Sequence, residues 1–285
     1  MSRDASQLSA GLYLIATPLG TARDITLRAL DILAEVDVLV AEDTRSLRKL
    51  MQIHGVPLAD RPCFSYHDHN GTKVRPKILE HLEAGNSVAY ASEAGTPMVA
   101  DPGFDLARAV VEAGFALVSS PGPSAVITAL TLSGLPTDQF FFAGFLPNAA
   151  SKRKATLRGF RDIPGTLVFY ESPKRLGAML FDASDILGGD RRAAICRELT
   201  KKFEEIRRGT LSDLADYARQ NPTKGEIVVT IDRAPSDETS QSEIDESLKE
   251  ALQKMSVRDA ADFVASHYNL KKRPVYQRAL ELTKG

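Results

Sequence analysis

The stretch "SVAYASEAGTPMVADPG" (residues 87–103) decides the fold class of this chain. Its first part, "SVAYAS", is short, apolar and bounded by turn-forming residues, which predicts a buried strand. Two rigid steps, "AGTP" and "DPG", follow it in place of a polar turn, and they include Glu93 and Asp101. Gly95 and Gly103 let a ligand approach the backbone closely, while the prolines stiffen the loop and limit the entropy lost on binding. The stretch therefore predicts a central strand that ends at a preformed binding loop.

Strands and helices alternate on both sides of this stretch. Strands are predicted at 12–17, 36–43, 63–66 and 115–121, with helices at 24–35, 44–55, 73–85, 104–114 and 124–134. This alternation predicts βαβ units and a mainly parallel sheet, which binds ligands beyond the carboxyl ends of its strands. We expect Asp24 and Thr44 to cap the first two helices and Gly55 to end the second. Residues 11–135 are predicted to form one α/β domain.

A second α/β set begins near residue 138, after the short join "LSGLPTDQ" (132–139). Its strands are predicted at 139–145, 165–171, 192–199 and 225–234, with a helix at 173–188. We therefore expect a second α/β domain over 138–234. The polar, acidic segment 235–247 predicts a flexible linker. Residues 248–285 predict a basic helical unit of three helices, with eight Lys or Arg against four Asp or Glu and a capping box at Ser256.

Composition limits the class of protein. The 285 residues suffice for two packed domains, and a net charge of -1 does not by itself indicate a nucleic-acid partner. The two cysteines, Cys63 and Cys196, exclude a disulfide framework and fit a reducing compartment. The N-terminus lacks an apolar signal core and no apolar run reaches ~18 residues, so we predict a cytoplasmic protein without a membrane span.

Three rigid loops follow predicted strands: "ATPLGTARDIT" (16–26), 91–103 and "SSPGPSAV" (119–126). The sequence contains neither GxGxxG after the first strand nor GxxxxGK[ST], so the common nucleotide-binding loops are missing. One such loop is adequately explained as a tight turn that closes a compact fold. Three at successive strand ends favour a preformed pocket for a small molecule.

Several charged motifs leave two interpretations open. "EDTR" (42–45) is either a salt-bridged cap or part of a cleft. "YHDHN" (66–70) lacks a third metal ligand, so we favour hydrogen-bonding or RNA-contacting roles over a metal site. "SKRKATLRGFR" (151–161) is either a solvated face or a groove for a polyanion. "RELTKKFEEIRRG" (197–209) mixes charges and is predicted to be a salt-bridged segment beside the cleft.

Taken together, the motifs "TPLG", "DIT", "AEDTR", "SEAGTPMVADPG", "PGPSA", "GFLP", "YESPKR", "RELTKKFEE" and "GEIVV" resemble the tetrapyrrole methylase superfamily over residues 11–234. The resemblance implies a two-domain α/β fold with S-adenosylmethionine in the cleft between the domains, plus the C-terminal helical unit. The chain is most similar to members that methylate the ribose 2′-oxygen of a decoding-centre cytidine in small-subunit (16S) rRNA. This implies the small ribosomal subunit as partner, a homodimer, and no metal or membrane.

Two positions depart from the family pattern. The family usually has Gly-Asn-Leu where this chain has Gly20-Thr21-Ala22, and Asp where it has Glu93. By carry-over, the resemblance implies cofactor contacts from both domains. These are Pro18, Ser92, Glu93, Ala94, Gly95, Thr96, Asp101, Ser120, Ser124, Ala125, Phe145, Leu199, Glu226, Ile227 and Val228.

The implied reaction is an in-line attack of a ribose hydroxyl on a sulfonium methyl group, aligned by the protein and assisted by a general base. Lys201 would need a lowered pKa to act as that base. We also expect Gly95→Val to abolish cofactor binding in a folded protein, since the motif places backbone against the ligand. Candidate bases are Glu42, Asp43, Glu171, Glu198 and Lys201; candidate phosphate contacts, each equally explicable as a surface ion pair, are Arg45, Lys152, Arg153, Lys174 and Arg175.

Two rival functions follow from the same sequence. A methylase of a tetrapyrrole or cobalamin precursor would share the fold and cofactor, but usually opens with a "GxGPG"-type loop where this chain has "ATPLG". A non-catalytic ribosome-binding factor would keep the fold without binding the cofactor.

Overall fold

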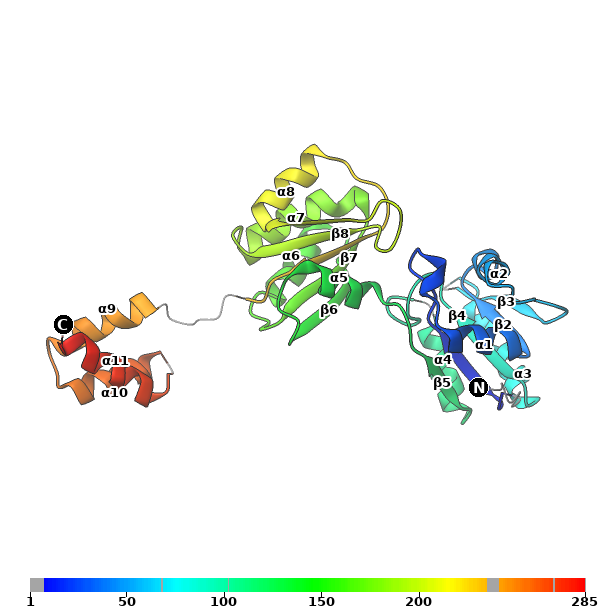
Figure 1. Cartoon of the computed structure of the whole chain (residues 1–285), viewed down its shortest axis with the longest axis horizontal. Helices are drawn as coiled ribbons and strands as arrows, with labels where there is room; N and C mark the ends of the chain where they lie inside the picture. Colours follow the sequence, from blue (N-terminus) through cyan, green and yellow to red (C-terminus); the bar gives the residue numbers. More distant parts are fainter. Residues whose placement is uncertain (1–7, 68, 102, 235–240, 269, 285) are drawn as a thin grey trace. The chain divides into compact units, whose positions relative to one another are not determined.

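The computed structural model describes residues 8–67, 69–101, 103–234, 241–268 and 270–284 (Figure 1). The chain divides into two compact units, the first ending at Ala234 and the second beginning at Pro235. The first unit contains two five-stranded sheets and carries the candidate site.

The first sheet is entirely parallel and has the strand order β3-β2-β4-β1-β5. Every residue of β1 and β4 is buried, as expected for strands covered on both faces. Because β4, β1 and β5 are neighbours, the three rigid loops that follow them leave the same edge of the sheet side by side. The strands are β1 (Gly11–Ile15), β2 (Val38–Ala41), β3 (Cys63–Ser65), β4 (Ser87–Ala91) and β5 (Leu117–Ser120).

Helices cover both faces of this sheet. Helices α1 (Leu27–Glu35) and α2 (Thr44–Ile53) share one apolar cluster with it, and α3 (Gly71–Glu83) and α4 (Phe104–Glu112) share another. The helical spacing of Ala29, Ile32 and Leu33 gives α1 its buried stripe.

Two expected caps lie elsewhere. Thr26, not Asp24, caps α1 by accepting from Ala29 N, because Asp24 belongs to the short 3₁₀ helix η1 (Ala22–Asp24). Asp43, not Thr44, caps α2 by accepting from Arg45 N at 2.8 Å. In both cases the capping residue stands one position outside the first helical residue, where the backbone is still extended.

The second sheet is mixed, with the order β6-β7-β10-β8-β9 and only the β6–β7 pair parallel. Strand β9 (Glu205–Thr210) occupies part of the segment predicted to be a salt-bridged connection; its sequence EIRRGT carries no apolar alternation. Helix α8 (Leu211–Gln220) then starts from a Thr210–Asp213 capping box. The other strands are β6 (Phe140–Phe145), β7 (Thr166–Glu171), β8 (Arg192–Arg197) and β10 (Ile227–Ile231).

Helix α5 (Ala125–Ser133) packs on the second sheet, although the sequence placed it in the first domain. Its Val126, Ala129 and Leu130 share a cluster with side chains of β7, β8 and β10. Helices α6 (Ala150–Gly159), α7 (Pro173–Leu187) and α8 cover the opposite face. The chain therefore passes to the second sheet before α5, earlier than the boundary predicted at residue 135.

The second unit contains helices α9 (Gln241–Leu252), α10 (Val257–His267) and α11 (Lys272–Lys284), which share one apolar cluster. Ser256 caps α10 as predicted, accepting from Asp259 N at 3.2 Å. Residues 241–247 are helical, where the sequence predicted linker, because Ile244 and Leu248 place an apolar stripe at i, i+4 that packs into the cluster. The rest of the predicted linker, 235–240, lies outside the described residues.

Candidate active site

A cavity of about 460 Å³ opens in the first unit, a size typical of small-molecule sites. One wall comes from the loops after β1, β2, β4 and β5, and the other from β6, β7, β8, β10 and the start of α7. Most residues implied to bind the cofactor line it. These are Glu93, Ala94, Gly95, Thr96, Asp101, Ser124, Ala125, Phe145, Leu199, Glu226, Ile227 and Val228.

Three implied cofactor residues do not line the cavity. Ser92 is buried, and its hydroxyl donates to Gly95 O at 2.6 Å. Ser120 is also buried, at the end of β5, and Pro18 is half-buried beside the bridge between Thr17 and Gly95. These residues shape the loops behind the wall, because the wall itself is formed one position further along the first two loops and four positions further along the third.

Position 95 was expected to be glycine so that a ligand could approach the backbone, but the structure shows that the backbone conformation itself requires glycine there. Its N–H donates to Thr17 O at 3.0 Å and its carbonyl accepts from Thr17 N at 2.9 Å, so although Gly95 lines the cavity, these two backbone groups join two loops. Its φ of +83° disfavours any side chain, and a Cβ would lie 3.0 Å from Leu19 Cδ2. Gly95→Val would thus strain this loop, so a loss of cofactor binding in the variant would not by itself identify a ligand contact at Gly95.

Thr21, in the loop after β1, stands where the family usually has Asn. It contacts the loop that follows β8. Thr21 Oγ1 donates to Thr200 O at 2.5 Å, and Thr21 N donates to Thr200 Oγ1 at 3.3 Å. A Cβ on Gly20 would collide with Cγ of Lys201. Gly20 and Thr21 therefore join the two walls at the edge of the site, where only glycine fits at position 20.

The charge of the cavity lining is one-sided. Five carboxylates line it, and none of its described lining residues is Lys or Arg. Asp101 is fixed by Tyr90, whose hydroxyl donates to it at 2.6 Å, and by Gly103 N at 2.8 Å. Such a lining favours a cationic ligand. The five carboxylates are Glu42, Glu93, Asp101, Glu171 and Glu226.

Glu171, the last residue of β7, has a completely buried side chain. Its Oε1 accepts from Ser172 N at 2.8 Å and lies 3.2 Å from Arg175 Nε. Its Oε2 is buried without a hydrogen-bond partner among the described residues. Burial raises the pKa of Glu171, and the Ser172 N–H and the Arg175 charge oppose that rise. A ligand donor in the cavity would satisfy the orphaned oxygen.

The remaining candidate bases differ in whether they line the cavity. Glu42 follows β2 directly and lines the cavity, whereas Asp43, Glu198 and Lys201 do not. Hydrogen bonds from Arg45 lower the pKa of Asp43 to about 2, and the Glu226 N–H and Lys201 lower the pKa of Glu198.

Lys201 as general base is contradicted. Burial lowers its pKa, but its hydrogen bonds to Glu226 at 2.9 Å and Glu198 at 3.0 Å raise it more, so the pKa lies above its ordinary value. A lysine held between two carboxylates stays protonated and has no lone pair to accept a proton.

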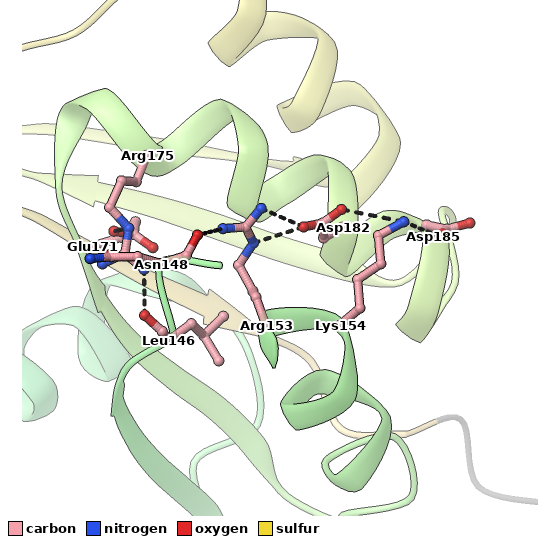
Figure 2. A network of polar contacts seen from close by, with 8 residues as sticks. All are labelled: Leu146, Asn148, Arg153, Lys154, Glu171, Arg175, Asp182 and Asp185. Atoms are coloured by element: carbon pink, nitrogen blue, oxygen red, sulfur yellow. Dashed lines mark hydrogen bonds and ion pairs between the residues drawn. The ribbon is translucent and has the colours of Figure 1, made fainter. Parts of the chain in front are cut away.

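The basic residues expected to contact phosphates divide into two groups. Arg45, Lys152 and Lys174 are exposed, although Arg45 also pairs with Asp43 at 2.8 Å. Arg153 is buried against Asp182, and Arg175 is half-buried beside Glu171, as Figure 2 shows. The burial of Arg153 against Asp182 therefore argues against a phosphate role for it, because its guanidinium is already bound inside the protein.

Tyr170 and Cys196 also line the cavity and were not predicted. Val228 of β10 pairs with Tyr170 on one side and Cys196 on the other, so the three residues form one row across the sheet. Burial raises the pKa of Cys196 to about 12, which keeps its thiol protonated. Only the register of antiparallel strands far apart in the sequence brings this row to the cavity.

Two further negative findings concern the described residues. No group of three or more His, Cys, Asp or Glu side chains is arranged to hold a metal ion within them. The rings of His67 and His69 lie edge to face, with 6.0 Å between their centroids; Asp68 lies outside the described residues. Across the described part of the chain, no helix combines the length and the apolar character needed to cross a membrane.

The sequence pattern of the tetrapyrrole (corrin/porphyrin) methylases matches residues 11–215, and that of the RsmI C-terminal HTH domain matches residues 238–283. The chain belongs to the tetrapyrrole (corrin/porphyrin) methylases. Solved structures agree in fold. The methyltransferase CobJ superposes with a TM-score of 0.62 at 19% identity, covering 79% of this chain and 95% of that one. Cobalt precorrin-4 methyltransferase CbiF gives 0.59 at 16%, covering 78% and 94%.

Curated relatives are more similar in sequence and nearly equal in length. Ribosomal RNA small subunit methyltransferase I of Mesorhizobium japonicum is 45% identical over 279 residues, covering 98% of this chain and 94% of the relative. The protein of the same name from Pseudomonas aeruginosa is 40% identical over 280 residues, covering 96% and 98%.

Proposed function

We propose that this protein transfers a methyl group from S-adenosylmethionine to the ribose 2′-oxygen of a cytidine in small-subunit (16S) rRNA. The observation that carries the proposal is the cavity beyond three adjacent parallel strands, lined by five carboxylates and by no described Lys or Arg. Relatives that match nearly its whole length are named ribosomal RNA small subunit methyltransferase I, which supports methyl transfer to small-subunit rRNA. The proposal places the protein in the cytoplasm with the ribosome.

The lining fits S-adenosylmethionine in three respects. The sulfonium and ammonium charges match the acidic lining, and the buried Oε2 of Glu171 lacks a donor that the ligand can supply. Phe145 and Tyr170, whose ring centroids lie 5.6 Å apart, give an aromatic surface suited to an adenine ring or a sulfonium. A structural neighbour, uroporphyrin-III C-methyltransferase from Thermus thermophilus (TM-score 0.55, 19% identity), was solved in complex with S-adenosyl homocysteine.

When bound, S-adenosylmethionine supplies an electrophilic methyl group, so the chain has to align the hydroxyl and remove its proton. Of the two candidate bases that line the cavity, Glu171 has a completely buried side chain whose Oε2 has no hydrogen-bond partner among the described residues, and burial raises its pKa, which makes its carboxylate a stronger base. Glu42, at the start of the loop that leads into α2, is the second candidate. Glu171→Gln should lower kcat ~10²-fold or more and flatten the acid side of the pH profile of kcat. If Glu42→Gln has these effects and Glu171→Gln does not, the general base is Glu42.

RNA contacts are proposed for two basic surfaces. On α2, Arg45, Arg48 and Lys49 are exposed on one side of the helix, which begins two residues after Glu42. In the second unit, Lys249, Lys254, Arg258, Lys271 and Arg273 make no ion pair with any described residue. Lys152 and Lys174 remain candidates on the same grounds of exposure.

We also propose a homodimer. Strand β6 is an edge strand, and Phe140 and Phe141 on it are 45% and 39% exposed. Leu117 on β5, an edge of the first sheet, is exposed as well. Exposed apolar edge strands favour association with a second chain. Light scattering of the purified protein tests this directly, and a monomeric mass at micromolar concentration would exclude it.

The main experiment measures transfer of labelled methyl from S-adenosylmethionine to small subunits from cells lacking this protein, with naked rRNA alongside. Label recovered as 2′-O-methylcytidine supports cofactor, substrate and reaction together. Absence of label with cofactor binding intact favours a methylase of a tetrapyrrole or cobalamin precursor. Absence of cofactor binding favours a ribosome-binding factor without catalysis.

A further inference from the structure

The segment Phe145–Ala149, here the wall loop, leaves β6 and enters α6. Phe145 lines the cavity and is 56% exposed, so packing alone fixes it weakly. The loop follows a bulge between Phe142 and Gly144, and Gly144 has a φ of +65°. Leu146, the next residue, is buried in the core on the other side. The direction of Phe145 therefore depends on how the backbone of the wall loop is held.

Arg175 holds one end of the wall loop. Its Nη2 donates to the carbonyl of Leu146, while its Nε lies 3.2 Å from Oε1 of the fully buried Glu171 (Figure 2). Glu171 is the last residue of β7 and Arg175 lies in the first turn of α7, so the pair joins the strand to the helix. The ion pair keeps the guanidinium beside the wall loop, although Nε makes no hydrogen bond with a described residue, and the Nη2 donor holds the Leu146 carbonyl.

Arg153 holds the other end in the same way. Its Nη1 donates to Asn148 O at 3.0 Å, and its Nε and Nη2 lie 2.7 and 2.6 Å from Asp182 Oδ2. The side chains of Arg153 and Asp182 are 8% and 6% exposed. Figure 2 shows the two guanidiniums reaching the wall loop from different helices, at carbonyls two residues apart.

Buried ion pairs are weak contributors to net stability, since well-packed apolar residues of similar size often serve as well. Such a pair does fix orientation, because a guanidinium bound to a carboxylate holds its remaining N–H donors in fixed directions. Here Arg153 is held through two nitrogens by Asp182 and Arg175 is ion-paired through Nε with Glu171, and each guanidinium points another donor at one five-residue loop. We propose that Arg153 and Arg175 are positioning residues that hold the wall loop, and through it Phe145, in the geometry that binds the cofactor; this rests on the proposed function.

The test compares full-length variants by calorimetry with S-adenosylmethionine. The double variant Arg153→Met/Asp182→Leu removes the charges together, so it keeps a packed interior while Asn148 O loses its donor. Arg175→Met removes the donor to Leu146 O. Each is expected to raise the Kd for S-adenosylmethionine about tenfold or more while binding of small subunits is unchanged.

Lys154→Met is the matched control, because Lys154 neighbours Arg153 and contacts Asp182 and Asp185 but donates nothing to the wall loop. Its Kd should equal that of the unmodified protein. If the double variant does not fold, Arg153→Lys keeps the charge beside Asp182 without the fork, and the same rise in Kd is expected.

Folded double and Arg175 variants with an unchanged Kd would overturn the proposal. A loss of small-subunit binding at constant cofactor Kd would also overturn it and return these arginines to phosphate binding. Failure of the unmodified protein to bind S-adenosylmethionine would overturn the proposed function instead, and is distinguished because it does not depend on any variant.

Discussion

Two basic helices of this protein look alike in sequence, but the fold exposes the basic side chains of one and buries or pairs those of the other. Helix α2 carries Arg45, Arg48 and Lys49, and α6 carries Lys152, Arg153 and Lys154. On α2 all three cations are exposed, and the side chain of Arg45 is 89% exposed. On α6 the middle cation is buried against Asp182, and Lys154 lies between Asp182 and Asp185 (Figure 2). A run of positive charge thus indicates a surface for a polyanion only where the fold provides no buried carboxylate opposite it.

The largest expected effect tests the buried side of this comparison. Asp182→Ala leaves Arg153 buried without its counter-ion and should destabilise the first unit by about 3–5 kcal/mol. Asp185→Ala, which removes the exposed partner of Lys154, should change the free energy of unfolding by less than ~0.5 kcal/mol. Urea denaturation followed by circular dichroism measures both. Equal effects of the two variants would show that Arg153 and Asp182 are not the anchored pair.

The exposed side is tested by binding to small subunits. Arg48→Gln/Lys49→Gln on α2 should reduce the dependence of log affinity on log salt by roughly 1.5, at about 0.7–0.9 for each phosphate that is no longer neutralised. The Kd for S-adenosylmethionine and the thermal stability should stay unchanged, since neither side chain lines the cavity. An unaltered salt slope would remove α2 from the RNA surface. Lys77→Gln on α3, which covers the other face of the first sheet, is the matched control.

The smallest effect concerns pH. The pKa of Glu171 is raised above its ordinary 4.5, so its protonated form contributes stability at low pH that is lost as pH rises through the folded pKa. The pKa of Asp43 is lowered from 3.8 to about 2, so its contribution is present above pH 3.8 and lost as pH falls toward 2.

Urea midpoints of Glu171→Gln and Asp43→Asn, each relative to the unmodified protein, should therefore change with pH in opposite directions. The stability of the unmodified protein relative to Glu171→Gln should decrease as pH rises from the ordinary pKa of 4.5 through the folded pKa, by about 1.4 kcal/mol for each unit of pKa difference. Its stability relative to Asp43→Asn should decrease only below pH 4, and by little, because Asp43 pairs with the exposed Arg45. Parallel pH profiles would contradict the separation of the two carboxylates.

Much of the site was accessible from sequence because it is built from loops. Gly, Pro and acidic residues after apolar strands identified the loops that follow β1, β4 and β5, and most of the implied cofactor residues do line the cavity. The strand β9 was missed because the sequence EIRRGT shows no apolar period. Tyr170 and Cys196 were missed because they reach the cavity only through their pairing with Val228.

The series of motifs resembled one methylase family, and the sequence by itself determined the parallel sheet, the binding loops at its carboxyl edge and the apolar stripes of the helices. These structural features depend on local periodicity and turn chemistry, which involve residues close together in the sequence. Tertiary structure alone decided that α5 packs on the second sheet, that Lys201 lies between two carboxylates, and that Arg153 is buried while Arg48 is not. The physical reason is that burial and charge pairing depend on partners tens of residues away, and those partners set the pKa of a carboxylate and whether an arginine can bind RNA.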